Sequence, residues 1–212
     1  AFMIRPVDVD PRFGLPVEVR AWYDLRLGEF ERRASRPHRA AVAFSAGLAR
    51  RPDDPRLLAA MTRLAADRND ARGVVTWGER ALAAGLDPEV LLLLTNAYES
   101  TGDTAAARHS RLAFDVATAD SDGAPFHRAW SLLLLDRGER VDEELARAES
   151  ALRDRRDIYA YDLYAWALHK AGRRDDAAVA LAQARRLGSR DPLLLAHAEA
   201  IEAARGTRVA QR

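Results

Sequence analysis

The 212-residue chain contains no cysteine, which excludes disulfide bonds, thiolate metal sites and cysteine nucleophiles together. Long apolar runs are also missing. The longest aliphatic stretches, residues 91–94 and 132–135, are far shorter than the roughly 20 residues that a membrane-spanning helix needs, so no membrane insertion is expected. Cysteine-free proteins occur in reducing and oxidising compartments alike. The composition therefore leaves open a cytoplasmic protein and one exported to the periplasm after removal of a signal peptide.

An excess of charge of either sign is absent as well. The chain carries 33 basic and 32 acidic side chains, and Lys170 is its only lysine. A balanced chain produces no global field that would hold nucleic acid, so no nucleic-acid partner is expected. The hydrophobic content of 48% is that of a folded globular protein.

Catalytic and cofactor motifs are lacking too. The sequence has no nucleophile elbow, no phosphate-binding glycine loop and no dinucleotide fingerprint. No two of its histidines are three or four residues apart, which is the spacing that places two metal ligands on one helical face. We therefore expect no catalytic residues, no metal site and no cofactor.

What the chain does have is a recurring set of helix-start and helix-end signals. Asp-Pro followed by a leucine-rich run occurs at 54–55, 87–88 and 191–192. Aspartate caps a free backbone N–H at a helix start, and proline fits the first helical turn because its missing N–H costs nothing there. Glycines that can end helices follow at matching offsets, namely Gly102, Gly138, Gly172 and Gly206.

Aligning these helix-start and helix-end signals predicts repeats of nearly constant length. The repeat starts are expected near Ala21, Pro55, Pro88, Ala124, Ile158 and Pro192, at steps of 34, 33, 36, 34 and 34 residues. In the unit at Ile158, large residues on the first helix face an alanine-rich second helix. The face formed by Ile158, Tyr161, Tyr164, Ala165 and Leu168 is expected to pack on Ala177, Ala178, Ala180 and Ala184.

A helix–turn–helix unit of about 34 residues resembles the tetratricopeptide repeat, or TPR. The unit at Ile158 carries the resemblance best, through Tyr161, Tyr164, Ala165 and Leu168 and then Ala177, Leu181 and Ala184, and "YAWALHKAG" looks like the last repeats of bacterial members. The resemblance covers roughly residues 21–205. It implies an all-α, right-handed α-α superhelical solenoid. We expect an extended N-terminal arm at 1–16, a solenoid of about five full repeats plus a C-terminal capping helix at 17–205, and a polar tail at 206–212.

The resemblance also implies where a partner binds, because in this family the first helices line the concave side and ligands usually lie there. Placing the units in register predicts a groove that mixes arginines with aromatic side chains. Its expected members are Trp22, Arg26, Glu29, Arg63, Leu92, Asn96, Glu99, Arg128, Tyr159, Trp166, His169, Lys170 and His197. The alternative for Trp166 is packing between neighbouring repeats, and for the arginines it is solvated surface without a ligand.

These expectations favour a non-catalytic scaffold or adaptor that binds a peptide or partner protein in the concave groove. Two alternatives belong to other classes. The chain can be a regulatory or sensory domain of a larger enzyme or transcription regulator, or a structural module that self-associates through the N-terminal arm or the C-terminal helix.

Overall fold

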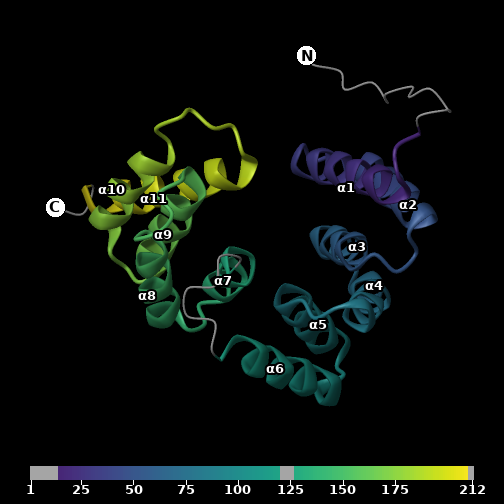
Figure 1. The fold of residues 1–212 in the computed structure, drawn as a ribbon. Helices are drawn as coiled ribbons and strands as arrows, with labels where there is room; N and C mark the ends of the chain where they lie inside the picture. The colour runs from purple at the N-terminus through teal and green to yellow at the C-terminus, as the bar shows by residue number, and fades with distance from the viewer. Residues whose placement is uncertain (1–13, 120–126, 210–212) are drawn as a thin grey trace. The chain divides into compact units, whose positions relative to one another are not determined.

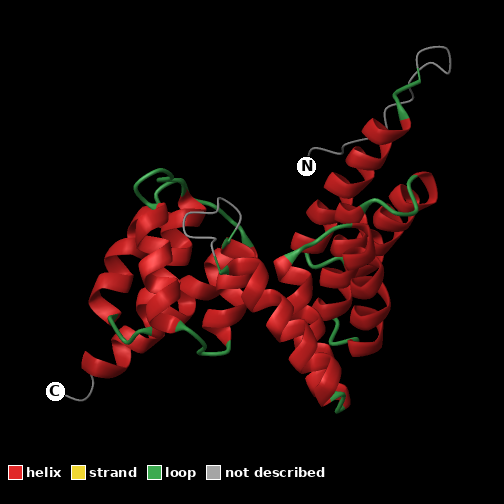
Figure 2. Ribbon diagram, turned by 60° about the horizontal axis from the view of Figure 1, so that its bottom comes forward, coloured by secondary structure: helices red, strands yellow, loops and turns green. Residues whose placement is uncertain are grey.

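The computed structural model describes residues 14–119 and 127–209. Within these ranges the chain forms eleven α-helices and no strand (Figure 2). None of the helices in the described ranges is both long and apolar enough to cross a membrane. The chain divides after Ala107 into two compact units, 1–107 and 108–212.

Unit 1 consists of helix pairs that follow one another along the chain (Figure 1). In its two complete pairs, α1–α2 and α3–α4, the first helix packs on the second, and the first helices α1, α3 and α5 also contact one another in sequence order. The helices are α1 (Val17–Arg33), α2 (Pro37–Arg50), α3 (Pro55–Asp67), α4 (Ala71–Ala84) and α5 (Pro88–Thr101).

Unit 2 begins inside α6 and continues the same alternation of first and second helices. Its central helix is α9, which contacts α7, α8, α10 and α11. The helices are α6 (Thr104–Thr118), α7 (Arg128–Asp136), α8 (Val141–Ala151), α9 (Ile158–Lys170), α10 (Arg174–Ala184) and α11 (Pro192–Val209).

The helix starts confirm the capping mechanism expected for Asp-Pro. The side chain of Asp54 accepts the backbone N–H of Arg56 at 3.1 Å, and Asp87 accepts that of Glu89 at 2.9 Å. Asp191 caps α11 in the same way. Each carboxylate satisfies an orphan donor of the first turn and so fixes where the repeat begins.

The five turns between first and second helices share one geometry. Each has a residue in the left-handed region, namely Ser35, Asn69, Gly102, Gly138 and Gly172. In every case the next residue donates its N–H to a carbonyl five residues earlier at 2.9 Å, as Arg173 does to Leu168. This is the hydrogen bond of a Schellman motif. Two of the repeats therefore make the same turn without glycine.

Small residues let the paired helices approach closely. A Cβ atom on Gly28 of α1 would lie only 2.2 Å from Cε1 of the buried Phe44 on α2. In unit 2, Ala177 and Ala184 of α10 are fully buried, and Ala177 belongs to the same core cluster as Leu168 of α9. The expected pairing of a large-residue helix with a small-residue helix is confirmed.

Several expected details differ. Helix α1 begins at Val17 rather than near Ala21, because Pro16 already marks its start, and α11 continues through Gly206 to Val209. The fourth unit's expected start at Ala124 and residues 1–13 of the expected arm lie outside the described residues, and α7 begins at Arg128.

The buried face of α9 is also broader than expected. Tyr161 and Tyr164 of the expected face are only half-buried, whereas Asp162, Leu163 and Trp166, on the other side of the helix, are buried. The cause is the position of α9 between four other helices, which leaves it little solvent-facing surface.

Candidate functional site

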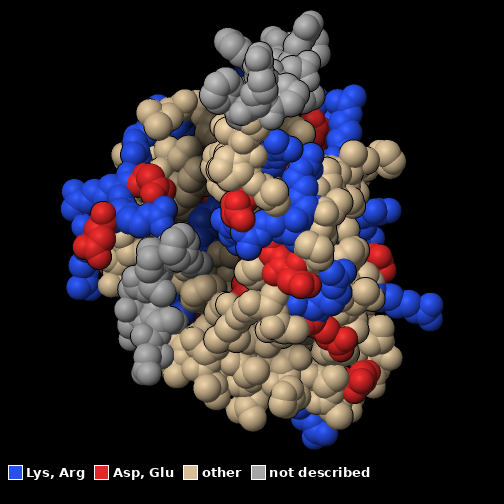
Figure 3. Space-filling view, turned by 45° about the vertical axis from the view of Figure 1, so that its right-hand side comes forward, with Lys and Arg blue, Asp and Glu red and all other residues tan. Residues whose placement is uncertain are grey.

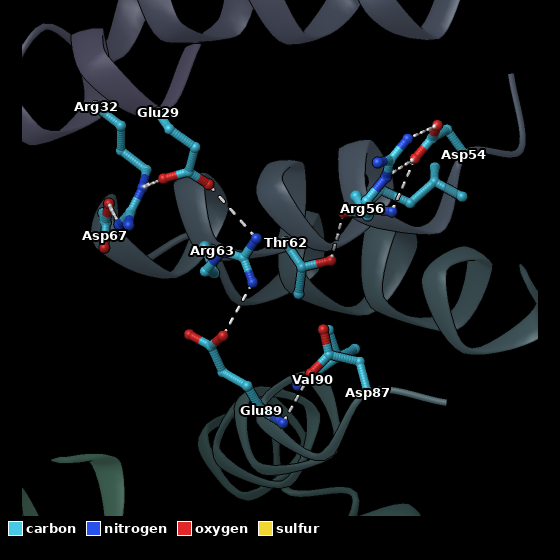
Figure 4. A network of polar contacts seen from close by, with 11 residues as sticks. Glu29, Arg32, Asp54, Arg56, Thr62, Arg63, Asp67, Asp87, Glu89 and Val90 are labelled. Atoms are coloured by element: carbon cyan, nitrogen blue, oxygen red, sulfur yellow. Dashed lines mark hydrogen bonds and ion pairs between the residues drawn. The ribbon is translucent and has the colours of Figure 1, made fainter. Parts of the chain in front are cut away.

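A ladder of charged side chains crosses the three first helices of unit 1 (Figure 4). It consists of Asp67, Arg32, Glu29, Arg63 and Glu89, and we call it the unit 1 ladder. Arg32 of α1 donates to Asp67 of α3 at 2.8 Å and to Glu29 at 3.3 Å. Arg63 of α3 lies between Glu29 at 3.4 Å and Glu89 of α5 at 2.9 Å. Positive and negative groups thus alternate from one end to the other.

Burial and the neighbouring charges of the ladder shift the pKa values of Arg63 and Glu89. Burial opposes the charge on Arg63, but the carboxylates of Glu89 and Glu29 outweigh it and raise the pKa of Arg63 above its usual value. Burial also raises the pKa of Glu89, and the nearby guanidinium of Arg63 offsets only part of that rise. Glu89 therefore accepts a proton more readily than an ordinary glutamate does.

The other residues expected on this side of unit 1 vary in accessibility. Trp22 is exposed and meets Tyr23 edge to face at 5.1 Å, and Arg26 is exposed. Asn96 is half-buried and Glu99 exposed, whereas Leu92 is buried.

In unit 2 the first helices meet around a buried carboxylate. Asp162 of α9 is 0% exposed, and Arg128 of α7 donates to it at 2.6 Å. Nδ1 of His197 on α11 lies 2.9 Å from its other oxygen. The guanidinium of Arg128 also lies over the ring of Tyr159, 5.2 Å from the centroid. Asp162 thus connects three successive first helices.

Trp166 lies next to this carboxylate and is enclosed by planar and charged groups. Its ring stacks on His197 at 4.2 Å and on His169 at 5.0 Å, and its Nε1 donates to Asp136 at 2.8 Å. The ammonium of Lys170 is 4.9 Å from the same ring. We call Asp136, Asp162, Trp166, His197 and Arg128 the unit 2 cluster. Its contacts are those of packing between neighbouring repeats, the alternative weighed for Trp166.

His169 is the histidine of this region with a shifted pKa. Burial lowers the pKa of His169, and the charges of Lys170 and Arg174 lower it further, so its ring is favoured as the neutral form. Its Nδ1 is buried and makes no hydrogen bond within the described part of the chain.

Most pairs in the ladder and the cluster are separated by one repeat. Glu29 and Arg63 are 34 residues apart, as are Arg128 and Asp162. Arg32–Asp67 and Asp162–His197 are each 35 apart. Sequence reasoning placed Glu29, Arg63 and Arg128 on the first helices but missed Arg32, Asp67, Glu89 and Asp136. A search for opposite charges one repeat length apart would have found several of these partners.

A second buried polar chain joins α7 and α8. Ser131 donates to Glu144, and Nδ1 of His127 lies 3.1 Å from the same hydroxyl; all three residues are buried. Burial lowers the pKa of His127 to about 4, and nearby arginines add to the effect. The hydroxyl lies between the imidazole and the carboxylate, so these residues lack the nucleophile–base–acid order of a hydrolase triad. In residues 14–119 and 127–205, no three His, Asp or Glu side chains are grouped so as to hold a metal ion.

Capped helix pairs, recurrent Schellman turns and contacts between successive first helices define an all-α helical-repeat solenoid of the TPR type. The structure resembles the crystal structure of a thermophilic TPR protein from Thermus thermophilus, with a TM-score of 0.59 and 21% sequence identity. The match covers 85% of this chain and 98% of that one. Neither the models of known protein families nor the curated proteins match the sequence. The likeness confirms the fold expected from the repeat length.

Proposed function

We propose that the chain is a non-catalytic scaffold that binds a peptide or a segment of a partner protein along the first helices of unit 1. The observation that carries this proposal is the unit 1 ladder, whose side chains are fixed by one another yet remain partly accessible. The side chain of Arg63 is 20% exposed, compared with 0% for Asp162 in unit 2. All five side chains of the ladder are partly exposed, from 15% for Glu29 to 48% for Asp67, whereas the carboxylate at the centre of the unit 2 cluster is closed to a partner.

Hydrogen-bonding capacity remains in the ladder after its internal pairs are formed. A guanidinium has five N–H donors, and two of those of Arg63 are used, one for Glu29 and one for Glu89. Because the ion pairs already fix the rotamers, a bound segment would order few side chains, which reduces the entropic cost of binding. A fixed polar surface of this kind suits an extended peptide.

The charges of the ladder indicate which peptides fit. Three carboxylates, Glu29, Asp67 and Glu89, face two guanidiniums, Arg32 and Arg63, so the ladder carries one excess negative charge. Figure 3 shows basic and acidic side chains lying beside one another on the face drawn there, without separation into zones. We infer that the bound segment is polar, carries a net positive charge and places an apolar residue near the exposed Trp22.

The proposal is tested by selecting peptides from a random 12-residue phage library against the whole chain and measuring their Kd by fluorescence anisotropy. Arg63→Ala and Trp22→Ala should each weaken the selected peptides at least tenfold. Arg39→Ala on the exposed surface of α2 is the matched control and should leave Kd unchanged. Circular dichroism at 222 nm verifies that the variants keep their helical content. Peptides that bind Arg63→Ala and wild type equally, or a library that yields no binder, would overturn the proposal.

A further inference from the structure

Helix α1 leaves one apolar face exposed. Tyr23, Leu27 and Phe30 are spaced by four and three residues, which places them side by side on one helical face. Their side chains are 55%, 43% and 58% exposed. We call these three residues the α1 face. It is turned away from Ala21 and Gly28, which are buried on the side where α1 contacts α2 and α3.

The equivalent positions in the later repeats of unit 1 are buried. The turn residues at 35, 69 and 102 align these repeats at steps of 34 and 33 residues. On this alignment the α1 face corresponds to Leu57, Met61 and Leu64 of α3 and to Val90, Leu94 and Ala97 of α5. All of these residues except the half-buried Met61 are at most 5% exposed. The α1 face is therefore a surface of a kind that the rest of unit 1 covers.

A second helix covers this surface in each of the later repeats of unit 1. Helix α2 packs on α3, and α4 packs on α5. A Cβ atom on Gly47 of α2 would lie only 2.8 Å from the side chain of Leu57, and one on Gly78 of α4 only 2.9 Å from that of Leu94. In both cases the missing side chain of a glycine makes room for a leucine of the next first helix. The covering helix thus presents a small residue at the contact.

Charge distinguishes the α1 face from its later equivalents. Arg26 lies on the same side of α1 and is exposed, whereas its counterparts Ala60 and Leu93 are 0% and 7% exposed. Arg33 is seven residues further along, so it lies on the same side as Arg26, and it is exposed as well. A helix that covers the α1 face would bury the guanidinium of Arg26, which is strongly unfavourable unless a carboxylate pairs with it.

We propose that the α1 face binds one helix of a partner protein, which takes the position that second helices take on α3 and α5. This partner helix is amphipathic and carries glycine or alanine opposite Tyr23, because the smaller Leu57 already requires a glycine. It also places acidic side chains beside Arg26 and Arg33. The site is separate from the unit 1 ladder, since Glu29 lies at least about 100° around α1 from all three residues of the α1 face.

A second copy of the chain does not meet these requirements. Helices α2, α4, α8 and α10 each pack on the first helix that follows them, so their covering faces are already occupied. A symmetric antiparallel pair of α1 helices, centred on the α1 face, would bring the two Arg26 side chains together. Like charges at that position repel, which favours an acidic partner helix over self-association.

The probe is a 14-residue synthetic peptide with the sequence of α2, the helix that covers α3. In the peptide, Arg39→Glu and Ala46→Glu place two carboxylates seven residues apart beside Gly47, which matches the spacing of the two arginines on α1. A hydrocarbon staple between positions 38 and 45, on the side opposite Gly47, holds the peptide helical. One matched peptide carries Arg39→Lys and Ala46→Lys instead, and another adds Gly47→Leu to the glutamate peptide. Fluorescence anisotropy gives the Kd of each peptide for the whole chain.

The glutamate peptide should bind the chain, and both matched peptides should bind at least about tenfold more weakly. Tyr23→Ser/Phe30→Ser in the chain should weaken the glutamate peptide by a similar factor; because both side chains are exposed, circular dichroism at 222 nm should not change. The control Val179→Ser/Leu187→Ser removes two side chains that are 70% and 73% exposed in unit 2 and should leave Kd unchanged. A glutamate peptide that fails to bind, or that the control weakens as much as Tyr23→Ser/Phe30→Ser does, refutes the proposal.

Two further measurements test the charge and the occupant. Arg26→Ala/Arg33→Ala in the chain should remove most of the preference for the glutamate peptide over the lysine peptide, and an unchanged preference would contradict the proposed pairing. Sedimentation velocity of the chain alone should show no dimer that depends on Tyr23 and Phe30. A dimer that Tyr23→Ser/Phe30→Ser dissociates would assign the α1 face to a second copy and overturn the proposal of a partner helix.

Discussion

Asp162 gives the sharpest prediction, because two first helices depend on one buried carboxylate. The substitution Asp162→Ala removes the acceptor of Arg128 at 2.6 Å and of His197 at 2.9 Å. A hydrogen bond that involves a charged group contributes about 1.5–3 kcal/mol. The side chain of Arg128 is 30% exposed and can turn toward water, so its loss lies at the lower end of that range. His197 is buried, so in the variant its Nδ1 loses its hydrogen-bond partner and cannot turn toward water instead.

The sum of these two losses is about 3 kcal/mol, at the lower edge of the 3–5 kcal/mol expected when one partner of a buried pair is removed. The substitution Arg128→Ala alone should cost less, about 1–2 kcal/mol, because it leaves Asp162 with His197 as a partner. The double variant Arg128→Ala/Asp162→Ala should then be less destabilised than the sum of the single variants, with a coupling of about 1 kcal/mol.

The assay must report on unit 2 alone, because a chain with two compact units need not unfold in one transition. Trp22→Phe and Trp77→Phe leave Trp130 and Trp166 as the only indole reporters, and both lie in unit 2. Urea unfolding followed by their fluorescence then gives the free energy of unfolding of that unit. A loss below about 1 kcal/mol for Asp162→Ala, or additive single variants, would refute the reasoning that Asp162 joins the first helices.

Three further predictions concern packing and pH. Leu168→Ala should lower the free energy of unfolding by about 2–5 kcal/mol. Tyr161→Ala should lower it clearly less, because Tyr161 is only half-buried. Chemical denaturation measures the free energy of unfolding of both variants. Gly28→Ala should cost at least about 1–3 kcal/mol by thermal or urea unfolding, because its Cβ would meet the buried ring of Phe44 and the core must shift. The pKa of His127 is lowered to about 4 in the folded protein and returns to about 6.5 on unfolding. Between these two pH values only the unfolded chain binds the proton. The free energy of unfolding should therefore fall as the pH drops from about 6.5 to 4, by at most about 3 kcal/mol. His127→Gln should remove that part of the pH dependence, and equal urea midpoint shifts in both proteins between pH 7.5 and 4.5 would contradict it.

Local signals in the sequence predicted most helix boundaries correctly. Asp-Pro pairs and helix-ending glycines act within a few residues, so the starts at Pro55, Pro88 and Pro192 follow from hydrogen bonds that the side chains themselves make. The errors occur where those signals are weak. Pro16 begins α1 without an aspartate before it, and Gly206 lies inside α11, where no left-handed residue is required.

The candidate site could be predicted only in part. The helical register placed Glu29, Arg63 and Arg128 on first helices, but their partners lie one repeat away in the sequence and emerge only when neighbouring repeats are stacked. The register alone also put Leu92 in the expected groove, although its side chain is buried. A residue's position on its own helix does not determine which neighbouring helices cover it.

The alternation of charge along the unit 1 ladder makes the order of the repeats matter. In arrays built from identical repeats, units can be exchanged or duplicated because every interface is the same. Here Arg63 lies between Glu29 and Glu89. Duplicating the second repeat would place one Arg63 beside another, and exchanging the first and second repeats would put Glu29 next to Glu89. Such an array can diverge by substitution within each repeat but resists rearrangement of whole repeats.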